Sequence, residues 1–271
     1  MSVMSVMSLI MAGIFGLAFG SFFNLCIDRI PRGGSIVSPP SHCDSCGQRL
    51  GIPDLIPILS YLWLRGRCRY CGIKIPVRVI IVEIASVMLF VFLTWYILYH
   101  VSWGGTLQLV IALTYVSILL VIFVIDLEHL IIPNKIIYPA MIVALLFSWF
   151  WAGFEIGPLT ALLGGAIGLT LMLLPFLIFP DGLGMGDVKL ALFMGLACGF
   201  PLIFVALMVG ILYGGLVAVF LLLFRVKGRK DAIPFGPFLA GGMVLTLIWG
   251  PSILDVYQVA MVNLTSLLEK I

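Results

Sequence analysis

Residues 201–224 read PLIFVALMVGILYGGLVAVFLLLF, without a charged side chain anywhere in the run. A run of this length can cross a hydrocarbon core about 30 Å thick. In lipid it has to be helical, because each backbone polar group must find its partner within the chain. The whole chain has the same character: 62% of its 271 residues are hydrophobic and 10% are charged. An average soluble domain is about 45–50% apolar and about 25% charged. The sequence therefore predicts an integral membrane protein and excludes the soluble class.

Comparable apolar stretches recur along the chain and predict an all-α polytopic membrane protein with about eight transmembrane helices. They lie at residues 9–27, 79–100, 107–125, 136–154, 158–179, 189–200, 201–224 and 236–251. The first does not read as a secretory signal peptide, because residues 1–20 contain none of the Lys or Arg that such a peptide carries. Residues 252–271 mix apolar residues with Asp255, Asn263 and Glu269, and we expect an interfacial tail there.

The positive charges fall on one side of the predicted membrane topology. With the N-terminus outside and eight spans, the cytoplasmic segments are residues 28–78, 126–135, 180–189 and 225–235. They carry eight, one, one and four Lys and Arg residues, which is every one in the chain except Lys270. Because cytoplasmic loops are enriched in these residues, the distribution supports this orientation. The net charge of +3 then needs no nucleic-acid partner, and the predicted surroundings are membrane lipid.

We expect four parts along the chain, of which the second holds two cysteine pairs. The parts are a first transmembrane helix at 1–27, a small cytoplasmic domain at 28–78, a transmembrane core at 79–251 and the tail at 252–271. Cys43 and Cys46 form one CxxC motif, and Cys68 and Cys71 form the other.

Two such pairs at this separation are typical of a tetrahedral zinc site, and so small a domain needs a metal or disulfide staple. Disulfides are the alternative, but they are rare in the reducing cytoplasm. A redox CxxC motif is a third option, which two matched copies disfavour. Four cysteines also close the coordination shell. We therefore predict a structural zinc ion.

Two aspartates stand at the cytoplasmic ends of predicted spans. Asp126 ends the third span and Asp187 opens the sixth, and ionisable residues so placed indicate function. Two carboxyl groups at one site share a proton, so one can act as base and the other as acid in peptide hydrolysis. Gly184 and Gly186 precede Asp187, and residues without side chains let a substrate backbone approach closely. A helix-capping or snorkelling carboxylate is the alternative for each aspartate alone, and the pair together favours a protease.

Other acidic residues, and functions other than proteolysis, are alternatives to an aspartate pair in a protease. Glu128 should face away from Asp126 on a helix, and Glu83, just inside the second span, needs a partner such as Arg78 or Lys74. A transporter or channel would place polar residues deep in the spans, where the sequence has almost none. An assembly factor that binds its partner through the zinc module would leave the two aspartates unexplained.

The order of these motifs resembles the type IV prepilin peptidases, membrane aspartyl proteases with a G-x-G-D motif, over nearly the whole chain. The matching residues, in order, are Phe23 to Pro31, Ile52 to Asp54, Leu64 to Cys68, the two CxxC pairs, Asp126, Ile132 to Asn134, Gly184 to Lys189, and Pro234 to Pro237. The resemblance implies that Asp126 and Asp187 are the catalytic pair. It also implies that Gly184, Gly186, Lys189, Pro234 and Gly236 shape the site.

The resemblance further implies a bacterial inner-membrane enzyme that cleaves prepilins and pilin-like secretion or competence precursors. These substrates have a short basic leader, a glycine before the cut and a hydrophobic helix after it. Family members with four cysteines often also methylate the new N-terminus with S-adenosylmethionine, which points to Arg78 and Glu83. Here the chain reads Arg78-Val79-Ile80-Ile81-Val82-Glu83, without the Tyr-Pro pair that usually follows the arginine. A membrane aspartyl protease without methyltransferase activity, or with substrates cut within the membrane, therefore remains an alternative.

Overall fold

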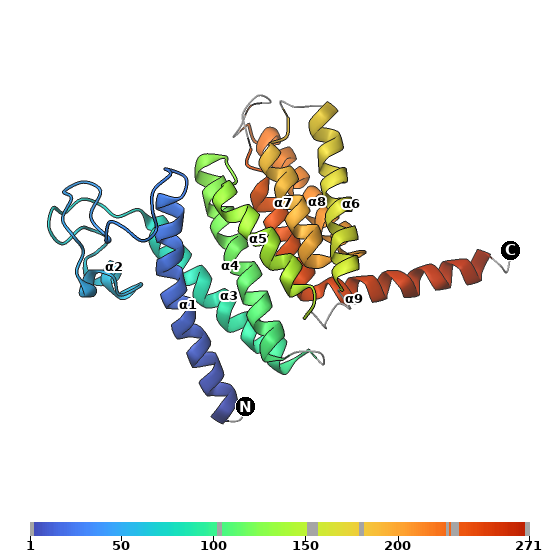
Figure 1. Cartoon of the computed structure of the whole chain (residues 1–271), viewed down its shortest axis with the longest axis horizontal. Coiled ribbons are helices and arrows are strands. Elements are labelled where there is room, and N and C mark those ends of the chain that lie inside the picture. The colour runs from blue at the N-terminus through green and yellow to red at the C-terminus, as the bar shows by residue number, and fades with distance from the viewer. Residues whose placement is uncertain are drawn as a thin grey trace. The chain divides into compact units, whose positions relative to one another are not determined.

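A computed structural model describes residues 3–101, 105–150, 157–178, 182–225, 228 and 233–268. Within these ranges the regular structure is helical (Figure 1). In chain order the elements are α1 (Val3–Arg29), the 3₁₀ helix η1 (Ile52–Asp54), α2 (Leu59–Trp63), α3 (Val77–Tyr99), α4 (Thr106–His129), α5 (Asn134–Phe147), α6 (Pro158–Ile178), α7 (Met185–Cys198), α8 (Leu202–Leu223) and α9 (Gly236–Leu268). Two isolated bridges, His42 with Arg49 and Arg67 with Lys74, are the β-pairing in the described residues.

The prediction of an all-helical membrane protein is confirmed. In the described ranges, five helices are long and apolar enough to span a membrane, namely α1, α3, α4, α6 and α8. The remaining predicted spans contain α5 and α7, of 14 residues each, and the apolar Gly236–Gly250 part of α9. The count of eight spans therefore stays a prediction. Residues 151–154 and 179, which were predicted to belong to spans, lie outside the described residues.

The chain forms two compact units, Met1–Val121 and Ile122–Ile271. In the first unit α1 packs against α3 through Gly16 and Gly20. A Cβ atom on Gly16 would lie 2.8 Å from the Cα atom of Val87, and one on Gly20 would lie 2.9 Å from that of Glu83. The hydroxyl of Ser86 donates to the carbonyl oxygen of Gly16 across this contact. Glycines spaced four apart let two membrane helices approach to backbone contact.

In the second unit α7 is the central helix, in contact with α5, α6, α8 and α9. Glycine again permits the closest approaches. A Cβ atom on Gly195 of α7 would lie 2.1 Å from the carbonyl oxygen of Gly164 on α6. Between α8 and α9, a Cβ atom on Gly242 would lie 2.4 Å from the carbonyl oxygen of Ala206. These contacts hold α7, and with it Asp187, in a fixed position within the unit.

Two boundaries that the sequence left open are visible in the backbone. Helix α7 ends at Cys198 and α8 begins at Leu202, with Gly199 between them at φ +68° and ψ 176°. This conformation is essentially restricted to glycine. At the other end, α9 continues without a break from Gly236 to Leu268. The interfacial placement of the tail at 252–271 stays a prediction.

Candidate active site and metal centre

Asp126 lies in the last turn of α4 and is 5% exposed. The backbone N–H of Gly236, the first residue of α9, donates a 3.0 Å hydrogen bond to Oδ2 of Asp126. A Cβ atom on Gly236 would lie only 2.7 Å from the same oxygen. The absence of a side chain at this position therefore lets the start of α9 approach the carboxyl group.

Asp187 is the third residue of α7 and is 9% exposed. It exchanges two hydrogen bonds with Gly184: its N–H donates to the Gly184 carbonyl over 3.0 Å, and the Gly184 N–H donates to Asp187 Oδ2 over 3.2 Å. The first turn of a helix carries partial positive charge, which favours a carboxylate there. The local sequence thus both caps the helix and fixes the carboxyl group.

The second unit brings the two aspartates together. They are close enough for the charge of Asp126 to act on Asp187. The side chain of Ile132 lies between the two glycine segments: it is 3.0 Å from a Cβ atom built on Gly186 and 3.4 Å from one built on Gly236. One isoleucine side chain is therefore packed against the backbone beside each aspartate. Two adjacent carboxyl groups, each with a backbone donor, can divide one proton between them as a base and an acid.

Lys189 follows Asp187 by two residues on α7 and contacts a neighbouring helix. Its Nζ atom donates a 2.8 Å hydrogen bond to Oδ1 of Asn134 and lies 5.3 Å from the centre of the Tyr138 ring. Both partners belong to α5. Lys189 therefore fastens the start of α7 to the start of α5. Pro234 is half-buried just before α9.

The two cysteine pairs form matching turns. Cys43 N–H donates to the carbonyl of Gln48, and Gly47 N–H donates to the carbonyl of Cys43. The same two hydrogen bonds recur twenty-five residues later. Cys68 N–H donates to the carbonyl of Ile73, and Gly72 N–H donates to the carbonyl of Cys68. Gly47 and Gly72 have φ values of +68° and +72°, the left-handed conformation that glycine adopts without strain. Both turns are therefore built to present two thiols each to one point.

The four thiols fit a zinc ion. Their sulfur atoms all lie within 4.8 Å of one another, and Sγ of Cys43 lies 3.8 Å from Sγ of Cys71. Two thiolates bound at 2.3 Å to a tetrahedral ion are themselves about 3.8 Å apart, whereas a disulfide has a sulfur–sulfur distance of about 2.0 Å. The arrangement supports the predicted metal site.

We expect the purified protein to contain one zinc ion per chain, measured by elemental mass spectrometry. Cys71→Ala should lose that metal, because three remaining thiolates leave the tetrahedral shell open. Cys26→Ala is the control, since Cys26 is buried in α1 outside the cluster and should keep the full zinc content. Retention of zinc by Cys71→Ala would contradict the four-cysteine site.

Sequence similarity to known proteins agrees with this site geometry. Residues 14–97 match the bacterial peptidase A24 N-terminal domain, and residues 113–219 match the type IV leader peptidase family. A prepilin leader peptidase/N-methyltransferase of Bacillus subtilis (strain 168) is 31% identical over 251 residues, which cover 90% of this chain and 95% of that protein. The chain belongs to the type IV leader peptidase family.

Other relatives in the family bear the same name. The Pseudomonas putida protein is 28% identical and covers 90% of this chain, with 91% of its own length aligned. The Myxococcus xanthus (strain DK1622) protein is 36% identical and covers 78% of this chain, with 62% of its own length aligned. No solved structure matches the chain. In this family member the four cysteines fall within the N-terminal match, and both aspartates fall within the leader peptidase match.

In this leader peptidase family member, Arg78 and Glu83 each have a partner that the sequence did not indicate. Oε2 of Glu83 accepts a 2.7 Å hydrogen bond from the backbone N–H of Ile58. Arg78 forms an ion pair with Asp28, with 2.5 Å between Nη2 and Oδ1. The expectation that Arg78 or Lys74 is the partner of Glu83 stays a prediction. The backbone N–H of Ile58 provides one hydrogen bond to Glu83, because the loop before α2 folds back onto α3.

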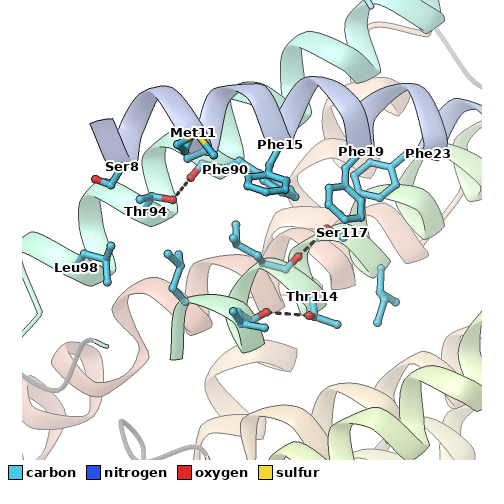
Figure 2. A pocket seen from close by; sticks show the side chains of 15 residues that line it. Ser8, Met11, Phe15, Phe19, Phe23, Phe90, Thr94, Leu98, Thr114 and Ser117 are labelled. Atoms are coloured by element: carbon cyan, nitrogen blue, oxygen red, sulfur yellow. Dashed lines mark hydrogen bonds between the residues drawn. The ribbon is translucent and has the colours of Figure 1, made fainter. Parts of the chain in front are cut away.

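An apolar cavity of about 500 Å³ lies in the first unit, lined by α1, α3 and residues 109–118 of α4. Figure 2 shows Phe15, Phe19 and Phe23 of α1 along it. It contains four hydroxyl groups, each of which donates to a backbone carbonyl of its own helix; they belong to Ser8, Thr94, Thr114 and Ser117. None of its lining residues is ionisable. The cavity is therefore separate from the candidate catalytic residues, since neither Asp126 nor Asp187 lines it.

Proposed function

We propose that this protein is an aspartyl endopeptidase that removes the leader from type IV prepilins and pilin-like secretion or competence precursors. Asp126 and Asp187 are its catalytic pair. The observation that carries the proposal is the pair of buried carboxyl groups within one unit, each held by the N–H of a glycine. Membership of the type IV leader peptidase family supports the reaction, and the names of the relatives support the substrate class.

In the proposed reaction one aspartate is ionised and the other carries the shared proton. The ionised carboxylate takes a proton from water, whose oxygen bonds to the carbonyl carbon of the scissile peptide. The protonated carboxyl then gives its proton to the departing nitrogen as the C–N bond breaks. The hydrogen bonds from Gly184 and Gly236 fix both carboxyl groups during these transfers. Gly186 keeps the backbone beside Asp187 free of a side chain.

The topology proposed for this reaction has eight spans and an external N-terminus, so both aspartates face the cytoplasmic side of the bacterial inner membrane. Residues 1–27 are the first span, 28–78 a cytoplasmic zinc domain, 79–251 the peptidase core and 252–271 an interfacial tail. The one-sided distribution of Lys and Arg supports this orientation. A precursor with its basic leader in the cytoplasm and its apolar helix in the membrane would present the scissile bond at the depth of the aspartates.

We further propose that the enzyme methylates the new N-terminus, as the names of its relatives indicate. S-adenosylmethionine would supply the methyl group. Of the two residues that the resemblance assigns to this step, Arg78 pairs with Asp28 and Glu83 accepts a hydrogen bond from Ile58. The apolar cavity also offers no charged group to the cofactor's amino acid end. The assignment of Arg78 and Glu83 to methyl transfer therefore rests on the family resemblance alone.

The test is co-expression with a pilin-like precursor, followed by mass spectrometry of its N-terminus. Loss of the leader with an added methyl group is expected. Leader loss without the methyl group would support the protease lacking methyltransferase activity. An uncut precursor with wild-type enzyme would favour a zinc-dependent assembly factor and would overturn the proposal.

Lys189→Met should slow leader cleavage about tenfold, because loss of one hydrogen bond to a charged group is worth roughly 1.5–3 kcal/mol and loosens α7 beside Asp187. The measurement is the initial rate of leader removal by the purified enzyme. Lys135→Met is the control, since it removes the same charge from an exposed position on α5. Equal rates for the two variants would show that Lys189 has no positioning role.

A further inference from the structure

Six of the large apolar side chains exposed between α1 and α3 lie within residues 52–63, which contain η1 and α2. We call them the α2 patch; they are Ile52, Leu55, Ile56, Leu59, Leu62 and Trp63. Trp63 is 86% exposed, Ile52 84%, Leu59 63% and Leu62 60%. A cluster of this kind on an otherwise polar segment marks a surface that is covered by something else.

The depth of α2 is fixed by one hydrogen bond. Ile58, the residue directly before α2, donates its N–H to Glu83 over 2.7 Å. Glu83 is six residues beyond Val77, where α3 begins, so at 1.5 Å per residue it lies about 9 Å along the helix from that end. Because the predicted second span begins at residue 79, four residues before Glu83, this point lies about 6 Å inside the end of the span, so that α2 lies close to the boundary between headgroups and hydrocarbon. Figure 1 shows α2 beside α1 rather than beyond its C-terminal end.

Ile58 adopts an unfavourable backbone conformation at the point where it makes this hydrogen bond. Its φ of +62° and ψ of −52° are a rare conformation for a β-branched residue. The same residue makes the hydrogen bond to Glu83, which is 5% exposed. A strained residue tied to a buried carboxylate holds α2 against the side of α3, and α2 directs its leucines and Trp63 away from the protein.

Basic residues directly follow the patch. Arg65 and Arg67 are exposed and come two and four residues after Trp63. A tryptophan and leucines beside arginines are the composition of segments that lie in the membrane interface, with the apolar side chains below the headgroups and the cations at the phosphates. This charge pattern complements an anionic lipid surface rather than an apolar protein groove.

We propose that the α2 patch is a lipid-docking surface, inserted into the headgroup region of the bilayer that the chain spans, with Arg65 and Arg67 at the phosphates of anionic lipids. The occupant is lipid of the same membrane. The zinc-binding segment is thereby held against the membrane at α2 as well as at its two ends. This inference is independent of the proposed peptidase activity.

The test uses full-length protein in vesicles of phosphatidylglycerol and phosphatidylethanolamine that carry bromine on their acyl chains, which quenches tryptophan fluorescence. The contribution of Trp63 is the difference between wild type and Trp63→Phe. Loss of most of that emission is expected, with stronger quenching by bromine near the headgroup than by bromine near the chain end. In vesicles without phosphatidylglycerol the quenching should fall, and Arg65→Gln together with Arg67→Gln should abolish this dependence on lipid charge.

The matched control is Gln48→Trp in the Trp63→Phe background, because Gln48 is an exposed polar residue on the first cysteine turn. Its emission should be quenched by aqueous iodide and not by the brominated lipid. Equal quenching of Trp63 and of this control by iodide would overturn the proposal. Protection of Trp63 that develops only when a second protein is added would overturn it as well, in favour of a protein-docking surface.

Discussion

Asp126→Asn and Asp187→Asn are each expected to reduce leader cleavage by about 10²–10⁴-fold, the usual contribution of a general acid or base. Asparagine keeps nearly the same shape and can still accept the hydrogen bond from Gly236 or Gly184. It cannot take or give the catalytic proton. The measurement is the initial rate of leader removal by the purified variants, with membrane insertion and zinc content verified for each.

Glu128→Gln is the control for this experiment, because Glu128 is an exposed carboxylate two residues after Asp126 on the same helix. It should cleave at the wild-type rate. A double variant of both aspartates should be no slower than either single variant, since the two groups act on one proton. Normal cleavage by either single variant would remove that aspartate from the mechanism.

Gly236→Ala should reduce cleavage about 10²-fold, the loss expected when a catalytic group moves by about 1 Å. The added methyl group would lie 2.7 Å from Oδ2 of Asp126 and 3.4 Å from Cδ1 of Ile132. To make room, the carboxyl group must turn away or the start of α9 must move, and the hydrogen bond from residue 236 is strained in both cases. The variant should reduce the rate of cleavage with little change in zinc content.

Gly241→Ala is the matched control for this substitution. Gly241 belongs to the same helix, and a Cβ atom there has no neighbour within 4 Å. Alanine also has the higher helix propensity, so the control should be at least as stable and as active as wild type. If Gly236→Ala cleaves as fast as Gly241→Ala, the close approach at Asp126 has no role in the reaction.

Much of the fold follows from hydrophobicity, because a long apolar run has few alternatives to a helix in lipid. Each of the eight apolar stretches contains a helix in the structure. The short helices α5 and α7 are harder to interpret, since α7 is buried by its neighbours and its apolar length alone does not say whether it spans the membrane. The close helix pairs were missed, although Gly16 with Gly20, Gly164 with Gly168 and Gly210 with Gly214 are readable as G-x-x-x-G motifs.

The sequence indicated which residues belong to the candidate sites, but not which other groups these residues contact. Asp126 and Asp187 were singled out by charge and position, and the cysteines by spacing. The partner of Glu83 could not be predicted, because a backbone N–H from a distant loop leaves no mark in the sequence. Ile132 was also missed as a site residue. Its apolar side chain resembles many others in the chain, and its role depends on contact with two separate glycines.

The contact between α1 and α3 determines at what stage of synthesis the cysteine segment can bind zinc tightly. Synthesis proceeds from the N-terminus, so α1 is complete before its partner exists, and the segment with the four cysteines emerges between them. Closing a flexible loop costs entropy, and the backbone contacts at Gly16 and Gly20 bring the ends of this segment together independently of the metal. A ribosome-bound chain that stops before α3 should therefore hold zinc more weakly than the finished protein.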